Sequence, residues 1–149
     1  MEVKSVLVRH QSGEQPALVA AAAHFCALPV KYQAKNGFPV MELTAIPTGT
    51  AVRGETNCAR LLALIAPACP LLAFPEAVSE ADRSVLRVEV DSWVDEAARF
   101  ATADPATRAA FLAAFNDHLA LRTYFVGHSL SLADLAVFVA LAGGGLPAY

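Results

Sequence analysis

A short, capped and almost wholly apolar segment near the end of the chain constrains the fold more than any other feature. The run Ser131-Leu132-Ala133-Asp134 has the spacing of a capping box, in which two side chains satisfy free N–H groups of a first helical turn. Leu130 and Leu135 occupy the two positions of a hydrophobic staple, and the residues that follow are nearly all apolar. A helix that is apolar on all sides is buried, so we expect this one at the centre of a helical bundle. We assign Ser131 and Asp134 as its structural cap.

Two further helices are predicted before this segment, and no strand pattern accompanies them. A long helix begins with Ser79 as its cap. Trp93 shares a face of this helix with other apolar side chains, so we expect it in the core. The next helix begins at Asp104-Pro105, a cap residue followed by proline at the first helical position, and is predicted to end near Gly127. We therefore interpret residues 73–149 as an all-helical subdomain.

Strands and helices alternate in residues 1–72. Residues 3–9 are rich in β-branched side chains and predict a strand. A helix is predicted from about Pro16 to Cys26, with Ser12 available as its cap. We expect the apolar face of this helix to be buried, with Leu18, Ala22, Phe25 and Cys26 on it.

A second group of elements follows in the same half. Residues 30–35 and 38–44 are two extended runs around Asn36-Gly37, a pair typical of a two-residue hairpin. A third run, residues 50–53, precedes a helix over about residues 55–65. The apolar face predicted for this helix holds Cys58, Leu61, Leu62 and Ile65.

Charge argues against strong direct binding of nucleic acid. The formal net charge is −3, whereas neutralisation of phosphates needs clustered Lys and Arg. Residues 1–72 hold six basic and four acidic side chains, and residues 73–149 hold five and ten. Since 56% of the residues are hydrophobic and 17% are charged, the chain can bury a core instead of staying disordered.

Neither cysteine spacing nor the chain's start indicates a secreted or metal-binding protein. The three cysteines, Cys26, Cys58 and Cys69, are odd in number and lack metal-ligand spacing. We expect buried thiols, with no disulfide and no metal. The N-terminal region lacks the long apolar segment of a signal peptide, and no stretch is apolar enough to span a membrane. We expect a cytoplasmic protein.

Several of these segments resemble the glutathione S-transferase family. Residues 55–63 (ETNCARLLA) look like the segment that ends its thioredoxin-like half, and residues 126–134 (VGHSLSLAD) look like the capped helix of its helical half. Residues 119–127 (LALRTYFVG) and 89–93 (EVDSW) are similar to the transferase-like domain of eukaryotic cytosolic glutamyl-tRNA synthetases, including the glutamyl-prolyl enzyme. The resemblance is strong over about residues 79–142, and over the first fifty residues it rests on the order of elements.

The resemblance implies an α/β plus all-α fold with a glutathione S-transferase-like (GST-like) arrangement. Residues 1–72 would form a thioredoxin-like subdomain with a short second-helix region. Residues 73–149 would form the C-terminal-like helical subdomain, truncated because the family's helical half continues with further helices.

The synthetase branch implies a non-catalytic domain without a cofactor. It would dock GST-like domains of other aminoacyl-tRNA synthetases or of scaffold proteins in a multi-synthetase complex, and a homodimer is a further option. The parent protein would be an ATP-dependent glutamate-tRNA ligase, acting in translation, with its active site outside this chain.

A glutathione-binding protein or glutathione S-transferase is the alternative that the same family offers. Ser12 would supply the hydroxyl that holds the thiolate, Pro39 the cis-proline, and Glu55 with Thr56 the site for the γ-glutamyl end. Ser12 is better explained as a helix cap, and Glu55 and Thr56 equally suit a helix start.

The segment at Asn36-Gly37 bears on this alternative in two ways. An active transferase inserts a helix there that contributes to the glutathione pocket, so the short connection would leave that pocket open. A hairpin there also conflicts with a thioredoxin-like sheet, in which the first strand separates the second from the third. Either the hairpin or the standard strand order must be wrong.

Candidate docking residues lie on the outer flanks of two predicted helices. Leu64, flanked by Arg60 and Asn57, has the composition of an interface centre. Arg83 and Arg87 lie one turn apart and would meet an acidic partner. The alternative for these two arginines is a solvated face paired with nearby carboxylates, Glu80 and Asp91.

Overall fold

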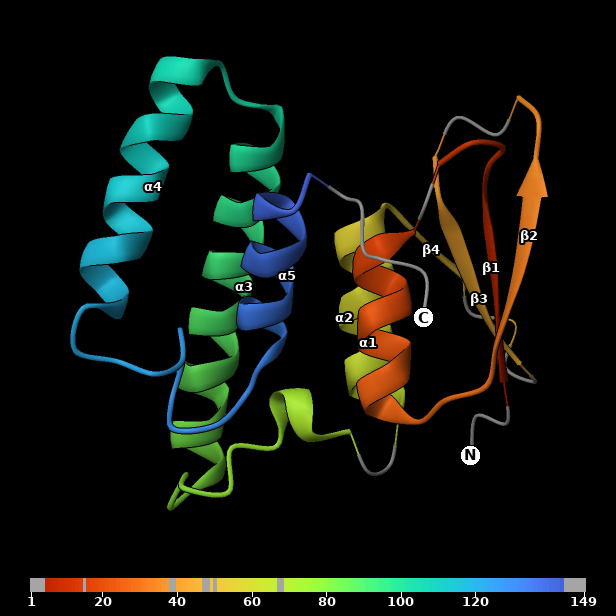
Figure 1. The fold of residues 1–149 in the computed structure, drawn as a ribbon. Helices are drawn as coiled ribbons and strands as arrows, with labels where there is room; N and C mark the ends of the chain where they lie inside the picture. The colour runs from red at the N-terminus through yellow and green to blue at the C-terminus, as the bar shows by residue number, and fades with distance from the viewer. Residues whose placement is uncertain are drawn as a thin grey trace.

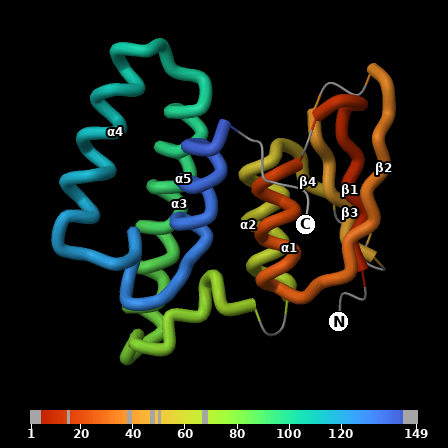
Figure 2. Tube along the Cα trace, viewed as in Figure 1, coloured from red at the N-terminus to blue at the C-terminus, as the bar shows by residue number. Residues whose placement is uncertain are grey.

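The computed structural model describes residues 5–14, 16–37, 40–46, 49, 51–66 and 69–143, and its elements form four layers. Figure 1 shows a sheet at one side, then α1 with α2, then α5 with α3, and finally α4 at the far side. The tube in Figure 2 follows the same path from the sheet to the bundle. The elements are β1 (Ser5–Gln11), α1 (Ala17–Cys26), β2 (Val30–Lys35), β3 (Glu42–Ile46), β4 (Ala51–Arg53), α2 (Glu55–Ile65), the 3-10 helix η1 (Pro70–Leu72), α3 (Glu80–Thr102), α4 (Pro105–Leu119) and α5 (Leu132–Leu141). The predicted fold class is confirmed.

The sheet has the order β2-β1-β3-β4, so the predicted hairpin at Asn36-Gly37 is wrong. β1 pairs in parallel with β2 and antiparallel with β3, and β4 pairs antiparallel with β3. The strand β1 therefore separates β2 from β3, as the standard order requires. Gly37 has φ 73°, which suits the turn that ends β2. Local turn preference is outweighed here because β1, with Val6 and Val8 fully buried, pairs along both of its edges.

Helix α1 begins at Ala17 and is not capped by Ser12. The chain turns just after β1, where the Glu14 N–H donates to the Gln11 carbonyl oxygen at 3.1 Å, and Ser12 lies exposed in that turn. Three of the four residues expected on the buried face of α1 are buried, but Phe25 is 41% exposed. The face of α1 that packs against α2 and α5 is formed mainly by small side chains, and Phe25 lies at the edge of this face.

The cysteine prediction is half right. Cys26, at the end of α1, forms a disulfide with Cys69, just before η1, so the expectation of no disulfide is wrong. The two residues are 43 positions apart and meet only through the tertiary fold. Cys58 is a buried free thiol, and burial raises its pKa to about 11, with smaller contributions from the Glu55 and Glu42 carboxylates.

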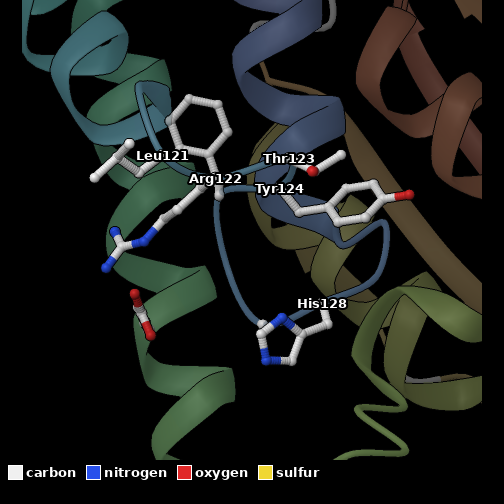
Figure 3. A pocket seen from close by; sticks show the side chains of 8 residues that line it. Leu121, Arg122, Thr123, Tyr124 and His128 are labelled. Atoms are coloured by element: carbon white, nitrogen blue, oxygen red, sulfur yellow. The ribbon is translucent and has the colours of Figure 1, made fainter.

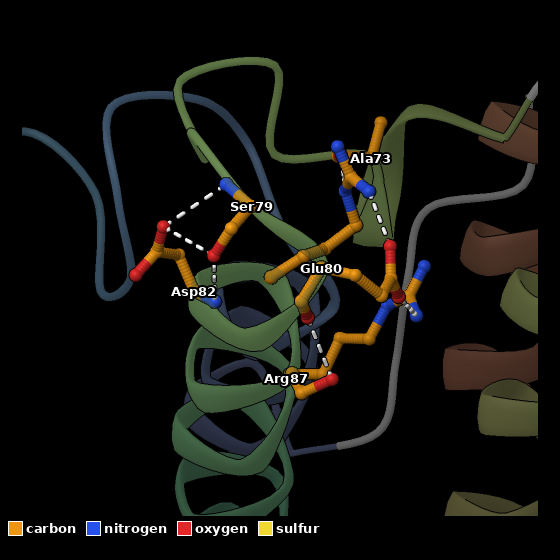
Figure 4. Close-up of polar contacts among 7 residues, drawn as sticks. Ala73, Ser79, Glu80, Asp82 and Arg87 are labelled. Carbon is orange, nitrogen blue, oxygen red and sulfur yellow. Dashed lines mark hydrogen bonds and ion pairs between the residues drawn. The ribbon is translucent and has the colours of Figure 1, made fainter.

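The helix α3 begins with the predicted cap. The Asp82 N–H donates to Ser79 Oγ at 3.1 Å, and the Ser79 N–H donates to Asp82 Oδ2 at 3.0 Å (Figure 4). Trp93 on α3 is partly buried and packs against the rings of Phe115, His118 and Phe125, which confirms its place beside the core.

The helix α4 ends at Leu119, earlier than predicted. Its N-cap, Asp104, accepts hydrogen bonds from the Ala106 and Thr107 N–H groups, as expected. Beyond Leu119, the backbone bonds to side chains from other elements instead of continuing the helix. The Phe125 N–H donates to Asp134 Oδ1 at 2.9 Å, and the His128 N–H donates to Glu76 Oε1 at 3.1 Å.

The helix α5 lies at the centre of the molecule, in contact with α1, α2 and α3. Asp134 Oδ2 accepts from both the N–H and the hydroxyl of Ser131 at 2.8 Å, so the predicted cap forms, and Ser131 is fully buried. The helix is buried on most sides, as expected, but Phe138 and Leu141 are 57% and 49% exposed. Among the described helices, none is long and apolar enough to cross a membrane.

We predict that Asp134→Ala lowers the free energy of unfolding by roughly 2 kcal/mol, because it leaves the Ser131 and Phe125 N–H groups without their acceptor. The matched control is Asp82→Ala, which removes a similar but exposed box and should cost about 1 kcal/mol or less. Urea unfolding measures both. Equal losses for the two variants would contradict a special role for Asp134.

We also predict the alkylation pattern of the cysteines. Folded protein at about pH 8 should resist iodoacetamide, because the Cys58 thiol is buried and its pKa is about 11. Unfolding without a reductant should expose Cys58 alone to labelling, and unfolding with a reductant should add Cys26 and Cys69. Mass spectrometry reads the labelled sites, and labelling of Cys26 without reductant would argue against the disulfide.

Candidate functional site

Glu55 joins the starts of two helices. It is the first residue of α2, and its Oε1 accepts a hydrogen bond from the Leu18 N–H in the first turn of α1 at 2.9 Å. Burial raises the pKa of this carboxyl above its usual 4.5, although backbone hydrogen bonds from Leu18 and Val19 favour the charged form. The carboxylate therefore caps α1, whose own N-cap residue, Pro16, provides no side-chain hydrogen bond.

The other residues of the predicted glutathione site are only partly brought together. Thr56 follows Glu55 in the first turn of α2 and is partly buried. Ser12 is exposed in the turn after β1. Pro39 lies outside the described residues. Glu55 and Thr56 are thus adjacent at a helix start, and the one carboxylate among them already has a partner within the chain.

Arg60 is the most connected of the predicted interface residues. Its Nε lies 2.7 Å from Asp91 Oδ1 and its Nη2 lies 2.6 Å from Asp95 Oδ1, both on α3. Nη2 also donates to the Asp91 carbonyl oxygen at 3.1 Å, and Nη1 to Asn57 Oδ1 at 3.1 Å. With its side chain only 20% exposed, Arg60 ties α2 to α3 and has few donors left for a partner.

Leu64 lies one turn further along α2 and is 61% exposed. Asn57, at the other end of the helix, is also exposed, and its side-chain amide donates to the Arg53 carbonyl oxygen at 3.1 Å. The outer flank of α2 therefore presents an uncovered leucine on a helix whose position is fixed by Glu55 at its start and by Arg60 in its middle.

Arg83 and Arg87 both pair with Glu80 at the start of α3. Arg87 Nη1 lies 3.2 Å from Glu80 Oε1, and Arg83 binds the other oxygen of the same carboxylate. Arg83 Nε also donates to the Ala73 carbonyl oxygen at 3.2 Å (Figure 4). The arrangement is the solvated, paired face considered above, except that Asp91 pairs with Arg60 instead.

A pocket of about 370 Å³, which was not predicted, lies in the helical half beside the loop that joins α4 to α5. Figure 3 shows Arg122 and Leu121 to one side of it, with Tyr124 and His128 towards the other. Glu89 of α3 also lines it, so it carries both charges. Gly127 in its wall has φ 63°, and a Cβ there would overlap the Glu76 carboxylate. Residues 119–134 stood out in the sequence for their family resemblance, but no signal there indicated a pocket.

The arrangement of the described side chains also bears on whether the chain could bind a metal ion. Across residues 5–143, apart from the undescribed positions, no group of three His, Cys, Asp or Glu side chains is arranged to hold a metal ion. The pocket is lined by Glu89 of α3 and by the loop between α4 and α5, whereas Glu55 lies at the start of α2.

We predict that Glu55→Gln removes a pH dependence of stability. In the parent protein the folded-state pKa is above 4.5, so the folded state binds the proton more tightly than the unfolded state. The contribution of Glu55 to the free energy of unfolding therefore falls as the pH rises from about 4.5 through the folded pKa, and is level above it. Glutamine keeps an acceptor for α1 and should abolish this fall.

Urea unfolding between about pH 4 and pH 8 tests this prediction. Asp117→Asn, which removes an exposed carboxyl on α4, is the control and should keep the parent profile. A Glu55→Gln profile with the parent's slope would show that the dependence arises elsewhere.

Comparison with known proteins relates this geometry to one family. A family model for the glutathione S-transferase C-terminal domain matches residues 92–145. The cytoplasmic glutamate–tRNA ligase of Arabidopsis thaliana is 40% identical over 57 residues, which are 38% of this chain and 8% of that protein. The chain therefore matches only a small part of that relative's length.

Solved glutathione transferases share the fold. The Ure2p6 protein of Phanerochaete chrysosporium in its apo form aligns with a TM-score of 0.74 at 12% identity, covering 95% of this chain and 81% of that one. A glutathione S-transferase from Xanthobacter autotrophicus aligns with a TM-score of 0.64 at 19% identity, covering 95% and 85%. At these identities the likeness shows the fold alone. Residues 92–145 thus match the C-terminal domain of the glutathione S-transferase family, the described residues have a glutathione S-transferase-like fold, and a 57-residue stretch is similar to a cytoplasmic glutamate–tRNA ligase.

Proposed function

We propose that the chain is a protein-protein interaction domain of a glutamyl-tRNA synthetase, docking GST-like domains of other synthetases or scaffold proteins in a multi-synthetase complex. The observation that carries the proposal is Leu64, 61% exposed on the outer flank of α2. An exposed leucine on a rigid helix can fill a partner's pocket at little cost in conformational entropy. Glu55 and Arg60 supply the rigidity, since they bind α2 to α1 and α3.

This proposal assigns no reaction to the chain. Glu55, the one carboxylate of the predicted glutathione site, is already bound to the start of α1. The connection of residues 36–41 between β2 and β3 is too short to carry the helix of an active transferase. The parent protein would be an ATP-dependent ligase of the cytoplasm, with its active site outside this chain. Docking would raise the effective concentration of synthetases near one another for glutamyl-tRNA aminoacylation and translation.

Arg83 and Arg87 have a secondary place in this proposal. Both lie at the start of α3 and share Glu80, and their side chains are 30% and 38% exposed. An acidic partner would compete with Glu80 for them. The division of the chain after residue 72, a homodimer as the docked state and the absence of a cofactor all stay predictions.

A glutathione-binding protein or transferase is the second candidate function. It is favoured by Glu55 and Thr56, which stand adjacent in the first turn of α2, and by the shared transferase fold. In this case glutathione would have to displace the Leu18 N–H from the Glu55 carboxylate or bind beside it.

The docking proposal predicts that Leu64→Asp abolishes partner recovery. Tagged chain is used as bait in a cytosolic extract of its own source, and bound proteins are identified by mass spectrometry. We expect other synthetases or transferase-like scaffold proteins with the parent and at least tenfold less with Leu64→Asp. The control, Leu112→Asp, alters a 47% exposed leucine on α4 and should recover what the parent does.

Two results would contradict the proposal. If Leu64→Asp and Leu112→Asp reduced partner recovery equally, the outer flank of α2 would not be the interface. Retention of the chain on immobilised glutathione, with elution by free glutathione and no synthetase recovered from the extract, would favour the second candidate function.

A further inference from the structure

The two faces of the sheet are covered differently. Figure 1 shows α1 and α2 together on one side of the four strands. The fully buried Val6 and Val8 of β1 point to that side. Side chains of a strand alternate between faces, so Leu7 and Arg9 point to the other. No helix formed by the described residues covers that second face, which we name the open sheet face.

The short link between β2 and β3 accounts for the lack of a helix on this face among the described residues. Residues 36–41 carry the chain from one edge of β1 across to the other. The described part of this link, residues 36–37 and 40–41, forms no helix. The helices α1 and α2 therefore both pack against the same face of the sheet.

The open sheet face has an apolar centre. Leu7 of β1 is half-buried, and Ile46 of β3, opposite Ser5, is 41% exposed. Thr44 lies between them, opposite Leu7. These side chains form a strip along the two central strands, and no helix among the described residues packs over it.

Positive charge flanks this strip on both sides. The pairing of β1 with β2 places Lys31 beside Leu7. Lys35 lies four positions after Lys31 on the same strand and therefore points to the same face. Both lysines lie at the β2 edge of the open sheet face. Arg53 lies at the other edge, opposite Glu42.

Among the described residues one carboxylate lies on this face, and it is already neutralised. Glu42 is bound by Arg9 Nη1 at 3.1 Å and by Arg53 Nε at 3.2 Å, and its side chain is 13% exposed. Lys31 and Lys35 are exposed and have no ion-pair partner among the described residues. In the described part of this face, four cations thus stand beside one carboxylate, on a chain whose net charge is −3.

We propose that the open sheet face binds an acidic amphipathic helix of a partner protein. Adjacent strands are about 4.8 Å apart, so the lysines on β2 and the single arginine on β4 are separated by roughly 14 Å across the strands. A helix with its side chains is about 10–12 Å across. Laid along β1 and β3, it would cover the apolar strip with its apolar stripe, and acidic residues on its flanks would reach Lys31 and Lys35 on one side and Arg53 on the other.

The chemistry of the face favours a protein over a nucleic acid. Single-stranded nucleic acids bind sheets through aromatic side chains on which bases stack. The aromatic residue of β2, Tyr32, is paired with Val8 and therefore lies on the helix side. The open sheet face is also separate from Leu64, which belongs to α2 in the helix layer, so this inference stands independently of the proposed function.

The test uses a fluorescein-labelled synthetic peptide of about 18 residues, with leucines along one helical stripe and glutamates on both flanks. Fluorescence anisotropy measures its affinity for the full chain. A scrambled peptide of the same composition and a peptide with lysine in place of glutamate are the ligand controls. We expect binding of the designed peptide only, weakening as salt rises.

Matched variants place the binding site. Lys31→Glu with Lys35→Glu should weaken binding at least tenfold, and Arg99→Glu with Arg122→Glu, an equal charge change on the helical half, should change it less than twofold. Amide shifts in an NMR titration of the parent protein give a second readout that does not depend on variants, and they should concentrate on β1, β2 and β3.

Three outcomes would overturn the proposal. These are equal weakening by the two double variants, equal binding of the scrambled peptide, or shifts confined to the helical half. Tighter binding of a single-stranded RNA oligonucleotide than of the peptide, lost in the Lys31→Glu and Lys35→Glu variant, would reassign the open sheet face to nucleic acid.

Discussion

The Asp134 carboxylate is the contact on which the arrangement of both halves depends. It holds the first turn of α5 through Ser131 and the preceding loop through the Phe125 N–H. α5 then contacts α3 in its own half and α1 and α2 in the other. A carboxylate at a helix start can accept hydrogen bonds from several N–H groups, and its negative charge interacts favourably with the helix dipole. Among the described residues the buried polar residue is Ser131, and Asp134 binds both its N–H and its hydroxyl, so this one carboxylate fixes the polar start of an otherwise apolar central helix.

The sequence predicted local features correctly where residues close together along the chain determine the structure. The caps at Ser79, Asp104 and Ser131 formed as predicted, since each involves residues within three positions of one another. The same reasoning failed at Asn36-Gly37, where a strong local turn signal met a competing parallel pairing of β1 with β2. It also failed for the end of α4, because the loop after Leu119 is held by Glu76 and Asp134 from distant elements.

Contacts between residues far apart in the sequence also limited the prediction of the candidate site. Residue types near Glu55 and Leu64 could be selected from sequence, but their roles depend on partners far along the chain. The Glu55 carboxylate meets α1 across 37 positions, and Arg60 meets Asp91 and Asp95 across 31 and 35. The Cys26–Cys69 bond belongs to this group as well. Even the open sheet face needed the strand order, since only the ladder places Lys31 and Arg53 on one surface.

The bridge from Arg60 to α3 has a mechanical consequence. The covalent path from α2 to α3 runs through residues 66–79, which include a short 3-10 helix and turns. Arg60 bypasses this path by joining the middle of α2 directly to the middle of α3. A pull applied to the outer flank of α2 is therefore shared at once by the helical bundle, and the two halves bear the load as one body instead of straining the linker between them.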